Sequence, residues 1–268
     1  MSKDFLAQIV AHKRGVVARL RAQDNARAWL NRALEDRQDR ARHLLGKALE
    51  AAPPMVKIIA EFKRMSPSRG VIRNDLSPTE AARCYERGGA CAISVLTDEE
   101  YFAGSINDLI AIRASTRLPI LRKDFILDPI QIYEAASAGA DAVLLIAAIV
   151  EDLALEKMRK TAEDELGLDA LVEVHTSDEL RRALNSGAKL IGVNNRDLQT
   201  FEVSLRTSEC LVAEVPPDAV LISESGLRNA AQLRHLHALG FHGFLIGETL
   251  MQAGDPASML RAMVESCK

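Results

Sequence analysis

Short apolar runs alternate with longer amphipathic segments along the chain from about residue 56 onward. Each run is typical of a buried strand, and each segment that follows has the apolar spacing of a helix. Ser or Asp begins several helical segments and Gly ends several, as helix caps favour. The pattern predicts eight strands, at residues 56–64, 91–98, 119–125, 142–149, 170–175, 190–196, 219–226 and 243–247.

Strict alternation of strands and helices predicts parallel strands joined by crossover helices. A doubly wound open sheet has that connectivity, and so does a closed (β/α)8 barrel of the TIM type. Eight units in this length favour the barrel, because closure leaves no strand edge unpaired. We therefore predict one α/β barrel domain over residues 1–268, with the barrel itself over 56–268 and no second domain after it.

The first 50 residues follow a different pattern. They are rich in Arg, Ala, Glu and Asp with helical spacing around Trp29 and Leu30. The segment 51–54, Ala-Ala-Pro-Pro, marks the entry to the first strand. We predict an N-terminal helical extension over residues 1–50 that lies over one end of the barrel.

Composition narrows the classes of function. Of the 268 residues, 48% are hydrophobic and 26% are charged, and the net charge is −3. This balance is typical of a globular protein and gives no basic field for nucleic acid or an anionic membrane. The longest apolar run, 142–150, is far shorter than the roughly 20 residues of a membrane span, and no signal peptide is visible. Four scattered cysteines without a CxxC pair favour reduced thiols and a cytoplasmic location.

Charged side chains in the predicted strands gather at the C-terminal ends, where the active sites of barrel enzymes lie. Because side chains alternate across a strand, Glu61 and Lys63 share one face, and Lys123 shares a face with Leu121 and Phe125. If these faces point inward, the mouth of the barrel holds six polar side chains: Glu61, Lys63, Lys123, Glu173, Asn194 and Arg196.

In any one strand, a solvated charge or a structural ion pair explains such a residue about equally well. Six polar residues from four strands favour a functional site. Two further segments, 223–226 and 245–249, end the last two strands with a glycine, where many barrels bind phosphate through backbone N–H groups. The segment 66–70 is either a polar surface loop or a lid or substrate-holding turn. The six histidines show no metal-ligand spacing, and no nucleotide-binding motif is present.

Eight segments together resemble one family, the indole-3-glycerol-phosphate synthases, in the family's order from about residue 56 almost to the end. The AEFKR, RKDF and GVNNRDL set separates this family from related phosphate-binding barrels. The matching segments are IIAEFKRMSPSRG, AISVLTDEEYFAGS, LPILRKDFILDPIQIYEA, GADAVLLIAAI, LVEVHTSDEL, LIGVNNRDLQTF, LISESGL and FLIGETLM.

The resemblance implies a reaction in tryptophan biosynthesis. The substrate would be 1-(2-carboxyphenylamino)-1-deoxyribulose 5-phosphate, and the products would be indole-3-glycerol phosphate, CO2 and water. A ring carbon attacks the ketone of the sugar chain, which requires a general acid at the carbonyl oxygen and then a group that removes a proton as the hydroxyl leaves. No cofactor and no metal are implied, and the only partner expected is the phosphorylated small molecule. We expect a monomer or a weak homo-oligomer.

The resemblance also implies roles for single residues. Lys123 would be the principal acid and Glu173 the acid/base carboxylate. Lys63 would pair with a substrate anion and take part in proton transfer. Glu61 would position Lys63, and Asn194 would orient the substrate. The binding residues would be Ser66 and Arg196 at an anionic end of the substrate, Phe125 and Leu144 beside its ring, and Ser225, Gly226, Gly247 and the backbone of Glu248 at the phosphate.

Two expectations concern charge. A lysine held among other cations has its pKa lowered, which would make Lys123 a better proton donor near neutral pH. The carboxylate of Glu248 would repel phosphate if it pointed inward, so only its backbone N–H is expected to contribute. The rival functions are another cofactor-free phosphate-binding barrel enzyme, either a sugar-phosphate isomerase or a Schiff-base aldolase, and a non-catalytic phosphosugar-binding subunit.

Overall fold

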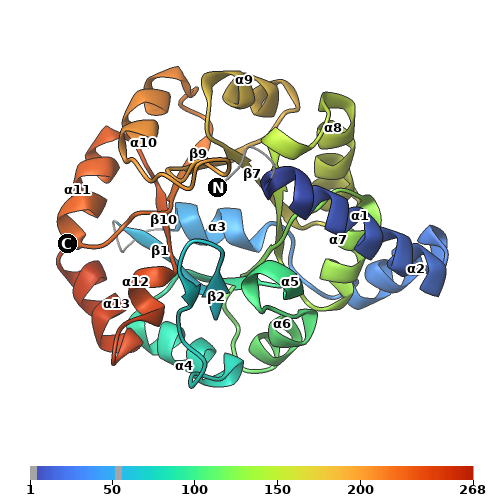
Figure 1. Cartoon of the computed structure of the whole chain (residues 1–268), viewed down its shortest axis with the longest axis horizontal. Coiled ribbons are helices and arrows are strands. Elements are labelled where there is room, and N and C mark those ends of the chain that lie inside the picture. Colours follow the sequence, from blue (N-terminus) through green and yellow to red (C-terminus); the bar gives the residue numbers. More distant parts are fainter. Residues whose placement is uncertain (1–4, 52–55, 268) are drawn as a thin grey trace.

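The computed structural model describes residues 5–51 and 56–267. Eight parallel strands close into a barrel in which each strand pairs with the next along the chain and the last pairs with the first (Figure 1). The prediction of a TIM barrel is confirmed, and each predicted run overlaps one strand. The strands are β1 (Lys57–Phe62), β4 (Ala92–Leu96), β5 (Ile120–Lys123), β6 (Ala142–Ile146), β7 (Asp169–Val174), β8 (Leu190–Asn194), β9 (Val220–Glu224) and β10 (Gly243–Ile246).

Helices surround the barrel and connect its strands. In the first helix after β1, which is α4, Ser77 is the N-cap and forms a capping box with Glu80. Gly89 ends the helix in the left-handed conformation, φ 89°. The larger helices are α4 (Pro78–Gly88), α6 (Ile106–Arg113), α7 (Pro129–Ser137), α8 (Asp152–Lys160), α9 (Ser177–Asn185), α10 (Arg206–Leu211), α11 (Ala230–Leu239) and α13 (Pro256–Glu265). Shorter elements are a hairpin of β2 (Met65–Ser66) and β3 (Gly70–Val71) and helices α5 (Glu99–Phe102) and α12 (Glu248–Met251). There are also two 3-10 helices, η1 (Ala147–Ile149) and η3 (Val212–Glu214), and a π-helical segment, η2 (Thr161–Glu165). Within the described ranges, no helix is both long enough and apolar enough to cross a membrane.

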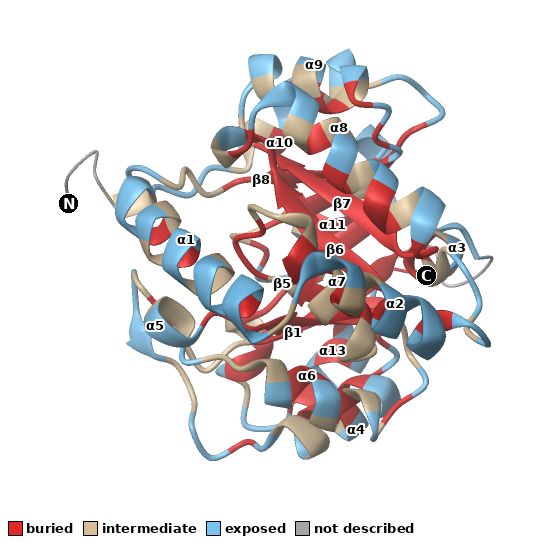
Figure 2. Cartoon of the chain, turned by 90° about the vertical axis from the view of Figure 1, so that its right-hand side faces the viewer, coloured by how far each residue is buried: buried red, intermediate tan, exposed pale blue. Residues whose placement is uncertain are grey.

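The apolar core has two layers, because side chains alternate across each strand. Outward-facing residues such as Phe62 and Val143 pack against the surrounding helices. Inward-facing residues such as Ile59, Leu144 and Leu171 fill the interior of the barrel. Strands and the inner faces of the helices are buried, and the outer faces of the helices are exposed (Figure 2).

The N-terminal extension consists of α1 (Phe5–Gln23), α2 (Ala26–Arg37) and α3 (Leu44–Glu50). Figure 2 shows α1 and α3 at opposite ends of the barrel, so the extension reaches both ends and not the single end that the sequence suggested. Between them, α2 packs against α7 on the outside. At the far end, α3 adds Leu45 and Leu49 to the inner core, and the backbone N–H groups of Leu45 and Gly46 donate to Asp169 (2.8 and 3.1 Å).

A buried ion cluster attaches α1 to the mouth of the barrel. Nζ of Lys13 lies 2.6 Å from Oδ1 of Asp124 and 2.8 Å from Oδ2 of Asp98, and all three side chains are buried. Burial alone would raise the pKa of Asp124, but the positive charges of Lys13 and Arg122 lower it to about 2. Lys13 and Asp124 therefore form a buried ion pair, and the contacts of Lys13 fix α1 to the loops that follow β4 and β5.

Replacing Lys13 with methionine is expected to destabilise the protein by about 3–5 kcal/mol, because it leaves buried Asp98 without its cation and leaves Asp124 with Arg122 alone. The free energy of unfolding in urea measures this effect. Arg14→Met is the matched control, since Arg14 is an exposed cation of the same helix and should change stability by less than about 0.5 kcal/mol. Equal losses in both variants would contradict the anchoring role of Lys13.

Candidate active site

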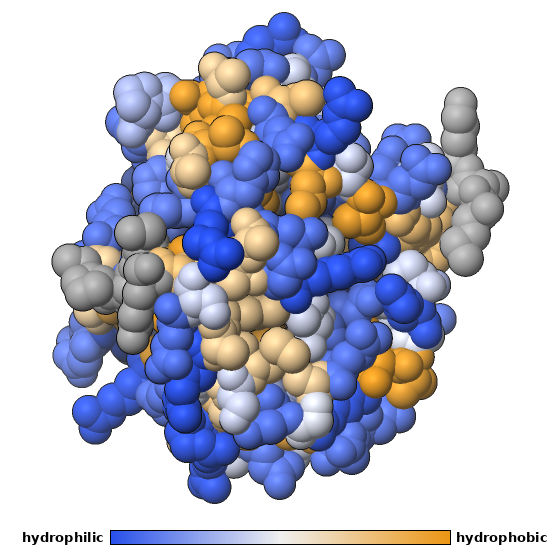
Figure 3. Space-filling view, turned by 90° about the vertical axis from the view of Figure 1, so that its left-hand side faces the viewer, coloured by the Kyte–Doolittle hydropathy of each residue, from blue (hydrophilic) through white to orange (hydrophobic). Residues whose placement is uncertain are grey.

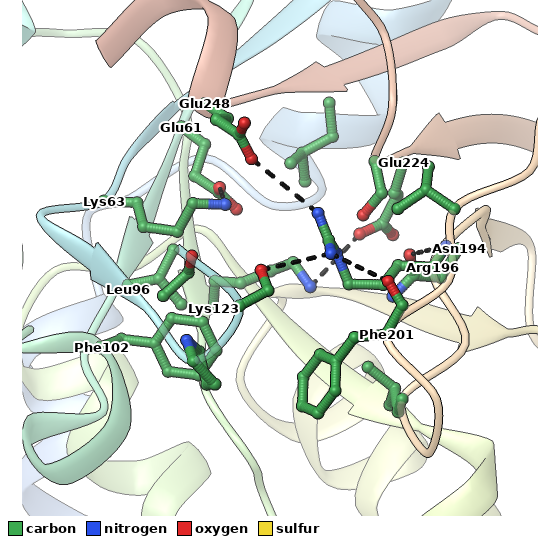
Figure 4. Close-up of a pocket in the computed structure, with 18 of the residues that line it drawn as sticks. Glu61, Lys63, Leu96, Phe102, Lys123, Asn194, Arg196, Phe201, Glu224 and Glu248 are labelled. Carbon is green, nitrogen blue, oxygen red and sulfur yellow. Dashed lines mark hydrogen bonds and ion pairs between the residues drawn. The ribbon is translucent and has the colours of Figure 1, made fainter. Parts of the chain in front are cut away.

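A pocket opens at the C-terminal ends of the strands, between α1, the β2–β3 hairpin and the loops after β8, β9 and β10. The structure brings the six polar side chains that parity sorted inward into the wall of this pocket. They are Glu61, Lys63, Lys123, Glu173, Asn194 and Arg196, and Figure 4 labels five of them, all except Glu173. They meet because neighbouring parallel strands end at the same rim of the barrel.

Lys123 lies between two buried carboxylates. Its Nζ is 2.8 Å from Oε2 of Glu173 and 3.2 Å from Oε2 of Glu224. Asn194 donates from Nδ2 to the other oxygen of Glu173 (3.0 Å), which fixes the orientation of that carboxylate. A hydrogen bond from the His175 ring nitrogen Nδ1 to the Asn194 carbonyl oxygen (2.7 Å) makes His175 a neighbour of this group. Lys123 thus contacts two carboxylates, of which Glu173 also accepts a hydrogen bond from Asn194 and Glu224 does not.

The expectation that the pKa of Lys123 is lowered was wrong. Burial lowers the pKa of Lys123, but the negative charges of Glu173, Glu224 and Glu61 together raise it by more than burial lowers it. The net result is a pKa well above the ordinary lysine value. The reason is the sign of the neighbouring charges: carboxylates contact Lys123, while Lys63, the other lysine that lines the pocket, is paired with Glu61 at 2.6 Å. Lys123 is therefore a charged ammonium group throughout the neutral pH range.

Glu224 belongs to this cluster, although the sequence pattern around it indicates only a phosphate-binding segment. Its side chain is 1% exposed. Neither of its oxygens has a hydrogen-bond partner among the described residues, and Oε2 has only its ion pair with Lys123. Burial raises its pKa to about 7, with Lys123 opposing this and Glu173 adding to it. The signal that could have found it is parity, because Glu224 shares a face with Val220 and Ile222, both in the inner core.

The side chain of Glu248 is paired with arginine side chains at the mouth. Oε1 lies 2.9 Å from Nη2 of Arg69, and Oε2 lies 3.9 Å from Nη2 of Arg196. Arg196 also donates to the Ser68 hydroxyl (3.3 Å), so the β2–β3 hairpin is joined to the rim across the mouth. The carboxylate of Glu248 is thus neutralised by two guanidinium groups. The hairpin segment 66–69 lines the pocket, which favours the substrate-holding turn over a plain surface loop.

The two glycine-containing turns after β9 and β10 also line the pocket. Ser225 and Gly226 both have left-handed backbone, with φ of 67° and 78°. This conformation is costly for a serine, and Asn195 supports it by donating to the carbonyl oxygens of Glu224 and Ser225 (3.0 and 3.2 Å). The strained turn thus faces the pocket beside Gly247, as an anion site after these strands would.

Apolar side chains form the remaining wall. Phe125 and Leu144 line the pocket as expected, and the ring of Phe102 lies 6.1 Å from that of Phe125. Helix α1 also contributes Phe5, Leu6 and Ile9, for which no role was expected from the sequence. In the described part of the chain, no group of His, Cys, Asp and Glu is arranged to hold a metal ion.

Comparison with known proteins identifies relatives over nearly the whole chain. The family model described as indole-3-glycerol phosphate synthase matches residues 6–263. A protein of that name from Carboxydothermus hydrogenoformans is 47% identical, with 97% of this chain and 99% of the relative covered. Another from Desulfosudis oleivorans is 44% identical (97% and 98% covered), and one from Leifsonia xyli subsp. xyli is 49% identical (80% and 82% covered).

Solved structures share the fold at much lower identity. The 3-hexulose-6-phosphate synthase of Salmonella typhimurium has a TM-score of 0.63 at 16% identity, covering 79% of this chain and 98% of that one. KGPDC from Streptococcus mutans has a TM-score of 0.60 at 14% identity, covering 80% and 98%. These likenesses support the barrel architecture alone.

Proposed function

This chain belongs to the indole-3-glycerol phosphate synthase family, and we propose that the cluster around Lys123 closes the indole ring of its substrate. The reaction converts 1-(2-carboxyphenylamino)-1-deoxyribulose 5-phosphate to indole-3-glycerol phosphate with release of CO2 and water, in tryptophan biosynthesis. The protein is then a carboxy-lyase. The observation that carries the proposal is an ammonium group held 2.8 Å from one buried carboxylate and 3.2 Å from another, beside an apolar wall.

Lys123 is the proton donor in the first step. A ring carbon attacks the ketone, and the carbonyl oxygen takes a proton from the ammonium group as the new C–C bond forms. The raised pKa supports this role, because the proton is present at neutral pH and the charge stabilises the developing oxyanion. Loss of the carboxylate as CO2 then restores the aromatic ring.

Glu173 is the acid/base carboxylate of the second step. It removes a proton from the former N–CH2 carbon as the hydroxyl departs as water, which forms the C=C bond of the indole and leaves its N–H in place. The 2.8 Å contact lets that proton return to Lys123. Because CO2 carries away no charge, the cycle takes up one proton from solvent. Asn194 holds Glu173 in the required orientation and adds a hydrogen bond to the substrate. Glu224 keeps Lys123 charged from the other side.

Anionic groups at the two ends of the substrate have separate sites in this proposal. Ser225, Gly226, Gly247 and the backbone of Glu248 hold the phosphate. Lys63, positioned by Glu61, pairs with a substrate anion, and Arg196 and Ser66 contact an anionic end. The Ser66 hydroxyl supports this role, because it is buried without a hydrogen-bond partner among the described residues.

The aromatic ring of the substrate lies against Phe125 and Leu144. Holding the ring and the phosphate at opposite sides of the pocket brings the ring carbon and the ketone together, which replaces part of the entropy cost of cyclisation. The α1 residues that line the same pocket would cover the ring from the outside.

A Schiff-base aldolase is the strongest alternative, and the charge of Lys123 argues against it. A lysine must lose its proton to attack a carbonyl, and the surrounding carboxylates keep this one protonated. We also propose a monomer or weak homo-oligomer in the cytoplasm. The exposed large apolar side chains are spread over separate elements. They are Leu34, Val71, Ile110, Leu153, Val203, Leu239 and Met259. On the face that carries α11 and α13, strongly hydrophobic residues form small groups between polar ones (Figure 3).

The proposed activity is tested with purified protein and the carboxyphenylamino substrate. We expect indole fluorescence to appear together with one CO2 per product. Treatment with borohydride in the presence of substrate should label neither Lys123 nor Lys63, as judged by peptide mass. Well-folded protein that forms no indole product would end the proposal, and a reduced adduct on either lysine would favour the aldolase.

A further inference from the structure

Gly192 occupies an inward-facing position of β8 without a side chain. Leu190, on the same face, belongs to the inner core, and Asn194 reaches Glu173 in the mouth. The backbone of Gly192 lies outside the left-handed region, so its conformation does not require a glycine. Something other than backbone geometry must account for the missing side chain.

The carboxylate of Glu224 fills the space that a side chain at residue 192 would take. A Cβ built on Gly192 would lie 2.1 Å from Oε1 of Glu224 and 3.2 Å from its Cδ. The next nearest atom, Cδ1 of Leu171, is 3.3 Å away. An alanine therefore clashes first with the carboxylate, and Glu224 would have to move.

Hydrogen bonds do not hold Glu224 in place, since neither oxygen has a partner among the described residues. Its Oε2 nevertheless lies 3.2 Å from Nζ of Lys123, while Oε1 lies over Gly192. We propose that Gly192 is a positioning residue, which gives the Glu224 carboxylate the space it needs to reach Lys123. This inference rests on the proposed function, in which Lys123 is the acid.

The same arrangement occurs a second time in the mouth. A Cβ at Gly247 would lie 2.1 Å from Oε1 of Glu61, and Gly247 too has a φ outside the left-handed region, −117°. Glu61 in turn contacts Lys63 at 2.6 Å. In both cases a glutamate that contacts a lysine occupies the space left by a glycine without a side chain: Glu224 beside Gly192, and Glu61 beside Gly247. Gly192 is the better position to test, because no phosphate contact is assigned to it.

The test is a double-mutant cycle on kcat with four proteins: wild type, Gly192→Ala, Glu224→Ala and the double variant. Gly192→Ala is expected to lower kcat at least about tenfold in the wild-type background. In the Glu224→Ala background it should change kcat by less than about twofold, because the clashing atoms are gone. Gly254→Ala is the matched control, since a Cβ there meets nothing within 4 Å, and it should retain the wild-type kcat.

Two kinetic outcomes would overturn the inference. One is a kcat for Gly192→Ala within about twofold of the Gly254→Ala control, and the other is an equal loss in both backgrounds. If Gly192→Ala fails to fold, the double variant is expected to fold, and failure of both would also overturn it. Should wild type form no indole product, the proposed function fails separately. The free energy of unfolding then tests the steric part, which predicts that Gly192→Ala destabilises the protein only when Glu224 is present.

Discussion

Replacing Lys123 with alanine is expected to lower kcat about 10²–10⁴-fold, the usual contribution of a general acid. The reaction needs a proton at the carbonyl oxygen as the ring closes, and Lys123 is the ammonium group that two buried carboxylates hold at the centre of the mouth. Steady-state kinetics by indole fluorescence measures the effect. KM should change much less than kcat, because other residues hold the phosphate and the ring.

The matched control is Lys189→Ala, which removes an exposed lysine paired with Asp218 at 2.6 Å on the surface. This variant should keep the wild-type rate. Lys123→Gln provides a second test, because the glutamine can still donate a hydrogen bond to Glu173 but cannot supply a proton. Near-full turnover of either Lys123 variant, with far-ultraviolet circular dichroism unchanged, would refute the acid role.

The barrel was predictable because its signals are local. Apolar runs, helix caps and the eightfold alternation each reflect short-range rules, and all eight predicted strands are present. The docking of the N-terminal extension was not predictable. It depends on Lys13 reaching Asp98 and Asp124, two residues more than 80 positions away in the sequence. Nothing in the local pattern of α1 distinguishes Lys13 from an exposed lysine, so the contribution of Phe5, Leu6 and Ile9 to the pocket could not be anticipated.

The site was predictable in its membership but not in its electrostatics. Parity places Lys123 and Glu173 on the same faces as apolar residues of their strands, because a strand has a period of two, and the barrel fold turns those faces inward. The same rule applied to Glu224 would have added it, but the neighbouring Ser225 and Gly226 drew the whole segment into the phosphate site. The pKa of Lys123 depends on its distances to Glu173, Glu224 and Glu61. Because these carboxylates lie close to it, the pKa is raised, where neighbouring cations would have lowered it. No sequence pattern carries those distances.

Replacing Glu224 with glutamine is expected to lower kcat about 10²-fold or more and, at the same time, to stabilise the protein at alkaline pH. The loss of activity follows from removing a negative charge 3.2 Å from Nζ of Lys123. The gain in stability follows from the pKa of Glu224, which rises from an ordinary value of 4.5 to about 7 on folding. Because the folded state holds this proton more tightly than the unfolded state, the free energy of unfolding falls as pH rises from about 4.5 to about 7.

Above about pH 7 the carboxylate therefore destabilises the fold, by about 3 kcal/mol for a shift of this size. Glutamine has nearly the same shape and no charge, so the variant should gain up to about 3 kcal/mol at pH 8 and show no gain at pH 4. Urea unfolding at both pH values measures this difference, with Glu265→Gln on the exposed face of α13 as the control. The prediction is refuted if the difference in free energy of unfolding between Glu224→Gln and wild type is the same at pH 8 as at pH 4. The ionised Glu224 carboxylate thus lowers the stability of the fold. The loss of activity in Glu224→Gln would show that its charge is needed beside Lys123.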